Sequence, residues 1–281
     1  MKIAYGTYAM PLMKLEAAIP TLAQIGYDGV EICIGSKHLE SMPDQINLRR
    51  RKELKQLLKR HRQGVPAFMV LGHILEEDEQ AHQDNLELMR QVAQLARDLD
   101  VGETPVIARG IGGKSDLWEE QRDQIVQRFM DYAQLASVEG FIIAGEAHFG
   151  AAVDRSKRAI WVIETVDSPS AGLHFDIVHF YLAGERIEDS VNNLVPITVH
   201  THITDARRYA DGQFDLLLLG EGELDSVTYL KAMHKAGWTD FITLEVSARV
   251  WSAEGYDPVQ IAALSYSALN NAFKIAGVCR T

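Results

Sequence analysis

Cysteine, positive charge and long apolar segments are all scarce in this sequence of 281 residues, and each shortage excludes a class of protein. Because only two cysteines occur, Cys33 and Cys279, we expect a fold without disulfide bonds in a reducing compartment. The longest apolar runs fall far short of the roughly 20 residues that a membrane-spanning helix needs. Since residues 1–8 already alternate like a strand, we also expect no signal peptide and a cytoplasmic location.

The scarcity of basic residues argues against a nucleic-acid partner. There are 28 Lys and Arg against 39 Asp and Glu, a formal net charge of −11. A surface that binds nucleic acid needs clustered Lys and Arg. The one dense basic run, residues 49–62, carries Leu54, Leu57 and Leu58 at helical spacing. This spacing indicates an outer helix whose basic face is solvated.

No linker or low-complexity segment divides the chain, and strand-like and helix-like segments alternate along it. The predicted strands are residues 2–8, 30–35, 65–72, 105–111, 141–146, 173–176, 197–202 and 241–246. The predicted helices are residues 15–25, 48–62 with Asn47 as N-cap, a long helix ending near 99, 118–136, 155–166, 187–194, a helix capped by Asp225 and ending at 235, and 258–275. A long loop through Gly222 is expected after the seventh strand. Eight such alternations fit right-handed βαβ crossovers, so we predict an α/β fold, a single (β/α)8 TIM barrel domain over residues 1–281.

Four consecutive predicted strands end in a carboxylate or an imidazole. These residues are Glu146, Asp176, His202 and Glu245. In a parallel barrel the carboxyl ends of all strands meet at one mouth, so the four side chains are expected to gather there. Three carboxylates and one imidazole suit a hard divalent cation, and grouped carboxylates without a cation are costly. We therefore predict one metal ion per chain, with Mn²⁺ favoured over Mg²⁺, Co²⁺ and Zn²⁺.

Several short motifs support this interpretation: G-Y-D-G-V-E-I at 26–32, D-I-V-H at 176–179, H-I-T-D at 202–205, G-E-G-E-L-D at 220–225 and T-L-E at 243–245. With them the whole chain resembles the xylose-isomerase-like TIM-barrel superfamily. That superfamily contains sugar isomerases, ketose 3-epimerases, inosose dehydratase and the endonuclease IV nucleases. The resemblance implies the same four metal ligands, Glu146, Asp176, His202 and Glu245.

The resemblance also implies roles for residues around the metal. His179 and Arg208 match residues that hold substrate oxygens in the ketose epimerases. His148 and Glu31 are expected to line the pocket. His200 is expected to lie behind the metal site rather than to bind the metal, because the H-x-x-D pattern begins two residues later.

The sequence departs from the pattern of the three-metal nucleases, which need further histidines. Arg109 stands where their fourth strand offers a histidine, and residues 215–217 (D-L-L) stand where they have Asp-Arg-His. His73 is the one residue able to substitute for a remaining ligand. A site with one metal is therefore expected.

These features predict a divalent-metal-dependent sugar or keto-sugar isomerase or epimerase that works through a metal-stabilised enediolate. Glu146 and Glu245, on opposite walls, are the predicted catalytic acid and base. Loss of a leaving group from the same intermediate would instead give a lyase, either a dehydratase of a keto-polyol or an enzyme that cleaves a 3-keto glycoside. A sugar-binding barrel without catalysis would not require both glutamates. Glu221 and Glu223 disfavour a phosphorylated substrate. We expect a small sugar or keto sugar as partner and no membrane partner, and the sequence is compatible with a homo-oligomer.

Overall fold

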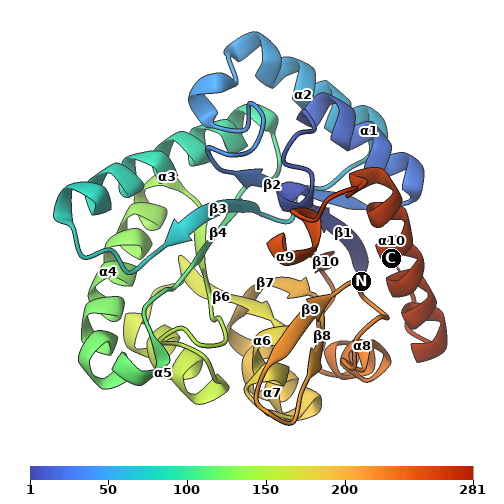
Figure 1. Cartoon of the computed structure of the whole chain (residues 1–281). Coiled ribbons are helices and arrows are strands. Elements are labelled where there is room, and N and C mark those ends of the chain that lie inside the picture. The colour runs from blue at the N-terminus through green and yellow to red at the C-terminus, as the bar shows by residue number, and fades with distance from the viewer. Residues whose placement is uncertain (281) are drawn as a thin grey trace.

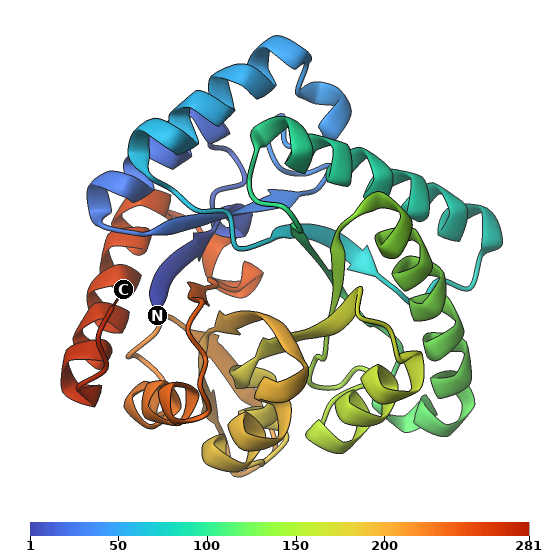
Figure 2. The same ribbon diagram turned by 180° about the vertical axis from the view of Figure 1, so that it is seen from behind.

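The computed structural model describes residues 1–280, and Thr281, the last residue of the predicted domain, lies outside the described residues. Eight parallel strands form a closed barrel in the order β1-β10-β7-β6-β5-β4-β3-β2 (Figures 1 and 2). The barrel strands are β1 (Lys2–Gly6), β2 (Gly29–Ile34), β3 (Phe68–His73), β4 (Val106–Gly110), β5 (Ile142–Glu146), β6 (Ala171–Asp176), β7 (Thr198–Ile203) and β10 (Phe241–Leu244). The predicted (β/α)8 barrel is confirmed.

Helices surround the barrel and cover the outer faces of its strands (Figure 1). They are α1 (Leu15–Ile25), α2 (Leu48–His61), α3 (Glu79–Leu99), α4 (Trp118–Glu139), α5 (Ser156–Val166), α7 (Ile187–Leu194), α8 (Ser226–Lys235) and α10 (Pro258–Ala276). Short 3-10 helices lie at Thr7–Ala9, Pro43–Gln45, Ser115–Leu117 and Val195–Ile197.

Helix α2 shows how local sequence sets these elements. The Asn47 side chain accepts a hydrogen bond from the Arg50 backbone N–H at 3.0 Å, which confirms the predicted N-cap. Leu54 and Leu58 are buried against the barrel, while most basic residues of the helix face outward. Asp225 caps α8 in the same way, through the Thr228 N–H at 2.9 Å. The basic run of the sequence is therefore the outer face of a helix.

Four elements near the carboxyl ends of the strands were not predicted. The expected long loop after β7 contains an antiparallel hairpin, β8 (Asp205–Arg208) and β9 (Phe214–Leu217). A short helix, α6 (Ile177–Leu182), follows β6 directly, and α9 (Ala248–Trp251) follows β10. The hairpin and α9 lie over one end of the barrel (Figure 1). The structure therefore covers part of the mouth with elements that the sequence analysis treated as loops.

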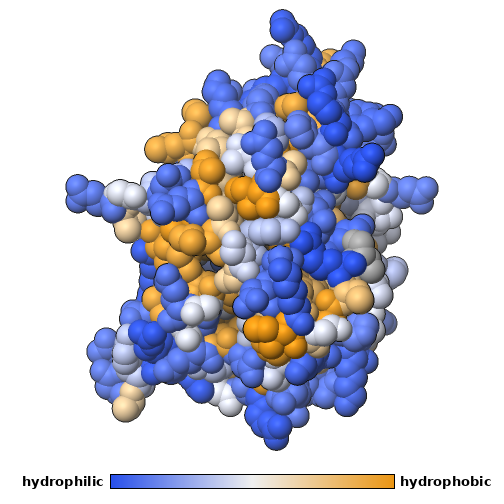
Figure 3. Space-filling view, turned by 90° about the vertical axis from the view of Figure 1, so that its right-hand side faces the viewer, coloured by the Kyte–Doolittle hydropathy of each residue, from blue (hydrophilic) through white to orange (hydrophobic). Residues whose placement is uncertain are grey.

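The chain ends lie side by side beside β1 and α10 in both ribbon views (Figures 1 and 2), and the Met1 amino group donates to the Cys279 carbonyl at 3.4 Å. On the side of the molecule over α10, apolar residues form several patches separated by hydrophilic ones (Figure 3). Within residues 1–280, none of the helices combines the length and the apolar character required to span a membrane.

Candidate metal centre

The four predicted strand-end residues gather at the carboxyl ends of neighbouring barrel strands. Glu146 ends β5 and Asp176 ends β6. His202 lies near the end of β7, and Glu245 directly follows β10. Each residue offers one ligand atom, and these four atoms all lie within 4.8 Å of one another. Because β6 and β7 separate β5 from β10, the two glutamates approach the centre from opposite walls.

Two of the four side chains carry buried polar atoms that no group in residues 1–280 satisfies. Asp176 Oδ1 accepts the Val178 N–H at 3.1 Å, but its Oδ2 has no hydrogen-bond partner there. His202 Nδ1 also lacks one, with Glu245 Oε2 at 3.6 Å. Orphaned buried polar atoms are costly and rare. A cation bound between them would satisfy both, so these residues fit a divalent metal ion.

The electrostatics of the cluster point the same way. Burial, followed by the charge of Glu245, raises the pKa of Asp176 to about 7. The same two causes, in the same order, raise the pKa of Glu146 well above its usual value. Carboxyl groups this close resist ionising together, and a nearby divalent cation would remove that resistance.

A buried carboxylate behind the cluster fixes the orientation of His202. Glu31 Oε2 lies 2.8 Å from His202 Nε2 and 2.6 Å from His200 Nε2. Burial alone would raise the pKa of Glu31, but the two histidines outweigh it and lower this pKa to about 2. An ionised carboxylate only accepts hydrogen bonds, so both Nε2 atoms must donate. Nδ1 of His202 is thereby left facing the centre.

This arrangement places His200 behind the cluster, where it was expected, and corrects the expected position of Glu31. Glu31 is fully buried in the middle of β2 and does not line the cavity at the mouth. Its depth requires Gly6, because a Cβ at that position would lie 2.8 Å from Glu31 Oε1. A third imidazole, His174, is buried beside His200 and His202, and the three also place ligand atoms within 4.8 Å. Burial and the neighbouring histidines lower the pKa of His174 well below its usual value.

A cavity of about 300 Å³ opens over the cluster, lined by three of the four cluster side chains and by His148 and His179. His179, in α6, places Nε2 3.6 Å from Asp176 Oδ2, and its ring lies 3.7 Å from that of His148. Tyr8, which the sequence analysis assigned no role, also lines the cavity. Burial and the charge of Glu245 raise its pKa. Tyr8 lies just beyond the end of β1. The four predicted ligands were found because they lie at strand ends, so the same criterion could have found Tyr8.

Comparison with known proteins identifies the architecture. The family model described as "Xylose isomerase-like TIM barrel" matches residues 19–269. The chain belongs to this family.

Curated relatives of this xylose isomerase-like chain act on sugars and inososes. An inosose isomerase of Bacillus velezensis is 22% identical over 226 residues, 79% of each chain. A fructoselysine 3-epimerase of Escherichia coli O157:H7 is 21% identical over 259 residues, 88% of this chain and 90% of the relative. Inosose dehydratases also match. The relatives of this chain therefore include isomerases, epimerases and dehydratases.

Among solved structures, the IolI protein with a binding zinc atom superposes with a TM-score of 0.79 at 19% identity, covering 97% of this chain and 99% of that one. At this identity the likeness shows the shared fold. The donor set found at the mouth of the barrel fits a divalent metal.

Arg208 does not line the cavity of this family member. It lies in β8, exposed, where Nη1 donates to the Tyr181 carbonyl at 3.2 Å and the guanidinium stacks over the Tyr181 ring. The cation that lines the cavity is Arg249 of α9, held over the ring of Phe214. The unpredicted elements β8, β9 and α9 account for both positions.

Arg109, at the position compared above with a nuclease histidine, points from β4 toward α3 and not into the barrel. Its guanidinium donates to the carbonyls of His73 and Leu71 and to Asn85 Oδ1, at 2.8, 3.3 and 2.8 Å. Asp215 is exposed in β9 and accepts from the Tyr209 hydroxyl at 2.7 Å. At two positions where a three-metal site would need ligands, this chain therefore has the buried guanidinium of Arg109 and the exposed carboxylate of Asp215.

Proposed function

We propose that this protein is a divalent-metal-dependent isomerase or epimerase of an unphosphorylated sugar or keto sugar. The observation that carries the proposal is the buried group of Glu146, Asp176, His202 and Glu245, with unsatisfied atoms directed at a common point. Mn²⁺ suits this oxygen-rich set, and the other divalent cations considered above also fit it.

The four side chains would hold the cation, and the two glutamates would also move the proton. A bound divalent cation stabilises the negative charge that develops on a carbonyl oxygen when the neighbouring C–H is deprotonated. One glutamate takes that proton from the carbon next to the carbonyl, and the glutamate on the opposite wall faces the other side of the same carbon. Return to the opposite face gives an epimer, and return to the former carbonyl carbon gives an isomer. His179 and His148, above the cluster, are placed to orient substrate hydroxyls.

The loop at residues 220–225 supports a substrate without phosphate. The Asp205 carboxylate accepts the backbone N–H groups of Gly220, Gly222 and Leu224 at 2.8, 3.1 and 2.9 Å. Backbone N–H groups of this kind are what a phosphate would need. Because a carboxylate of the chain already occupies them, the loop offers a phosphate few free donors.

The inosose dehydratases among the relatives favour a lyase as the second candidate. The same proton abstraction at the same carbon, followed by departure of a hydroxyl or other group from the adjacent carbon, gives an unsaturated product. The two reactions are separated by their products, since only the lyase changes the composition of the sugar.

The proposal is tested by loading the purified protein with each divalent metal and measuring deuterium incorporation into ketoses and keto sugars in D₂O. We expect about one metal per chain and deuterium on the carbon next to the carbonyl. Glu245→Gln should lower exchange by about 10²–10⁴-fold while the amide oxygen keeps much of the metal.

Glu254→Gln, an exposed change in the loop after α9, is the matched control and should leave exchange intact. Wild-type exchange in Glu245→Gln with full metal content would remove Glu245 from the chemistry. A stoichiometry near three metals would favour the nuclease alternative instead.

A further inference from the structure

A second cavity, of about 270 Å³, lies at the carboxyl ends of β3, β4 and β5. It shares Met69, Glu146 and His148 with the cavity over the metal cluster, so the two adjoin. We propose that this second cavity is a subsite for an uncharged ring joined to the reacting sugar, and hence that the substrate is a sugar conjugate rather than a free monosaccharide. The inference rests on the proposed function, because the reacting sugar must lie over the cluster.

The size of the two cavities supports an extended substrate. Ligand pockets generally measure about 300–1,000 Å³. The cavity over the cluster, about 300 Å³, is at the lower end of that range, and the second cavity is almost as large. Glu146 and His148 stand at the junction. A sugar that reacts beside Glu146 therefore has its neighbouring substituent directed into the second cavity.

The chemistry of the second cavity selects an uncharged group. Apart from the shared Glu146, its walls hold no carboxylate, and apolar side chains such as Leu71 and Ala151 alternate with glycine backbone. Its one permanent cation, Arg109, uses three of its nitrogens on Leu71 and His73 carbonyls and the Asn85 side chain. These acceptors are neutral, so Arg109 keeps its charge, but they hold its guanidinium against β3 and α3, and no second permanent cation lines the cavity for a phosphate or a carboxylate.

His73 completes the wall without adding charge. Burial, followed by the positive charge of Arg109, lowers the pKa of His73, which keeps its imidazole neutral. With His148 and His174 it gives the cavity three imidazole rings beside apolar side chains. Rings of this kind bind the flat face of another ring well. An aromatic or pyranose ring is therefore the substituent that this cavity fits.

The cavity is preformed, because the loops that build it are hydrogen-bonded to one another beyond the ends of the strands. The backbone N–H groups of Ile74, Ile111 and Ala152 donate to the carbonyls of Gly110, Glu146 and Gly112 at 2.7, 2.9 and 3.1 Å, respectively. Gly112 has φ +87°, and a Cβ there would meet the His73 Cβ at 2.8 Å. A fixed cavity does not have to be ordered when the ligand binds, which favours affinity.

The test measures binding of paired probes to the metal-loaded protein by calorimetry. Each of several hexoses is supplied as its methyl glycoside and as its phenyl glycoside. The two probes of a pair differ only in whether a methyl group or a phenyl ring is attached to the sugar. For at least one sugar the phenyl glycoside should bind about tenfold or more tightly than the methyl glycoside, the gain expected from burying a ring of this size. In Ala151→Phe, which fills the cavity, the ratio of the two affinities should fall to about one.

Ala17→Phe, on the exposed face of α1, is the matched control and should keep the wild-type ratio. Equal metal content in the three proteins shows that the cluster is intact. If no phenyl glycoside binds more tightly than its methyl partner, or if Ala151→Phe keeps the wild-type ratio, the subsite is refuted. Deuterium exchange of free ketoses without a phenyl gain would overturn the subsite alone. A phenyl gain without exchange on any sugar would overturn the proposed reaction alone.

Discussion

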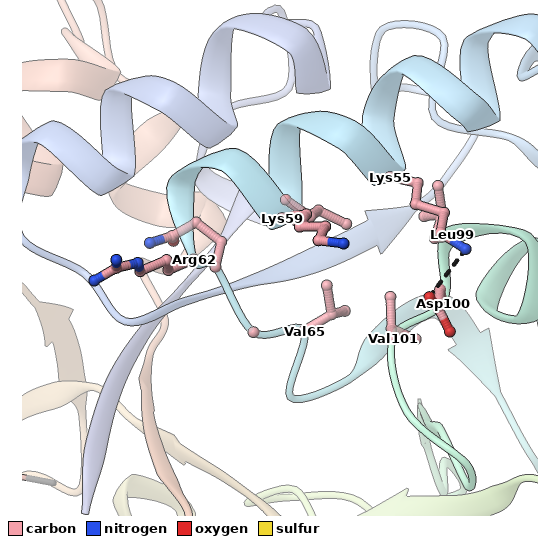
Figure 4. Close-up of a pocket in the computed structure, with 10 residues that line it drawn as sticks. Lys55, Lys59, Arg62, Val65, Leu99, Asp100 and Val101 are labelled. Carbon is pink, nitrogen blue, oxygen red and sulfur yellow. Dashed lines mark ion pairs between the residues drawn. The ribbon is translucent and has the colours of Figure 1, made fainter.

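At the carboxyl ends of the barrel strands, carboxylates and imidazoles are buried together, whereas the charged side chains around the cavities at the amino ends are mostly exposed. The amino end carries cavities of about 350 and 410 Å³, both larger than the cavity of about 300 Å³ over the metal cluster. Figure 4 shows the first of these, between α2 and the segment after α3, with Lys55 and Asp100 paired at 2.9 Å. Cavity size therefore does not identify the functional end of this barrel. The gathering of buried ionisable side chains around Asp176 and His202 is the feature that marks the carboxyl end as the candidate site.

The amino-end cavity is also a poor anion site despite its basic lining. Lys55 is occupied by Asp100, and Lys59 and Arg62 stand at the carboxyl end of α2 (Figure 4). The free carbonyls there carry partial negative charge, which attracts the basic side chains and repels an anion. The partial charge at the end of α2 therefore stabilises Lys59 and Arg62 and disfavours an anion beside them.

The largest effect expected is at the metal cluster, from His202→Ala. Removing one of four donors should weaken metal binding by more than the 10–100-fold that loss of an outer hydrogen-bond partner costs. The measurement is metal affinity by chelator competition, with His234→Ala on the exposed end of α8 as control. The metal-dependent rise in melting temperature should shrink in parallel, because a ligand that binds only the folded state stabilises it. An unchanged metal affinity would show that buried atoms without hydrogen-bond partners, such as His202 Nδ1, do not indicate where the metal binds.

The next effect expected is behind the cluster, from Glu31→Gln. Both histidines donate to the same oxygen, Glu31 Oε2, so the amide oxygen of a glutamine there still accepts from both rings but carries no negative charge beside them. A neutral oxygen is the weaker acceptor, so it holds the proton of His202 on Nε2 less firmly and leaves Nδ1 less often free for the metal. We expect metal affinity to fall about 10–100-fold.

Two measurements distinguish this effect from general damage to the fold. Nitrogen-15 NMR of the metal-free protein reports which nitrogen of His202 carries the proton. Glu164→Gln, an exposed change in α5, should alter neither the affinity nor the spectrum. A Glu31→Gln protein with wild-type affinity and an unchanged spectrum would leave Glu31 a packing role only.

A smaller effect, on stability, is expected from Asp154→Asn in the loop after β5. The Asp154 carboxylate accepts from Ser115, Arg155 and Arg158 at 2.5, 2.8 and 3.0 Å and is buried. Losing its charge should reduce the free energy of unfolding by about 1.5–3 kcal/mol, the usual worth of hydrogen bonds to charged groups. Urea denaturation of both proteins at neutral pH measures the difference.

The pH dependence of that difference checks its cause. Burial alone would raise the pKa of Asp154, but the hydrogen bonds from Arg155 and Ser115 outweigh it and lower this pKa. A lowered folded-state pKa means that the stabilisation is present above the unfolded pKa of about 3.9 and is lost as the pH falls through the folded value. The wild type and Asp154→Asn should therefore converge in stability as the pH falls below about 4. If the difference in stability between the two proteins persists in acid, it comes from packing and not from the charge of Asp154.

The sequence predicted the four cluster residues because parallel strands bring their carboxyl ends together, so position along each strand was enough. It did not predict α6, since that helix begins immediately after Asp176 and its six residues are too few to show a helical period. The hairpin was missed because polar residues such as Gln213 interrupt any alternation in that segment. The hairpin in turn moves Arg208 away from the cavity.

Glu31 illustrates a different limit. Alternation along β2 correctly places it inside the barrel, but its depth depends on how far the strand is shifted against its neighbours. That shift is set by packing around the whole barrel, including the close approach of Gly6, and no local pattern encodes it. A residue expected at the surface of the pocket is consequently found beneath it.

The smallest effect is expected at the amino end, from Lys55→Ala. The Lys55 and Asp100 side chains are 44% and 71% exposed, so water screens their attraction and holding two flexible chains together costs entropy. Melting temperature and metal affinity should both stay within error of the wild type, in contrast to Asp154→Asn, which also removes one partner of an ion pair. Glu53→Ala, which removes one partner of the exposed Arg49 pair in the same helix, gives the matched control. A loss of metal affinity in Lys55→Ala that is absent from Glu53→Ala would mean that the two ends of the barrel are coupled. The two ends would then differ in how exposed their charged side chains are, but not in whether they contribute to metal binding.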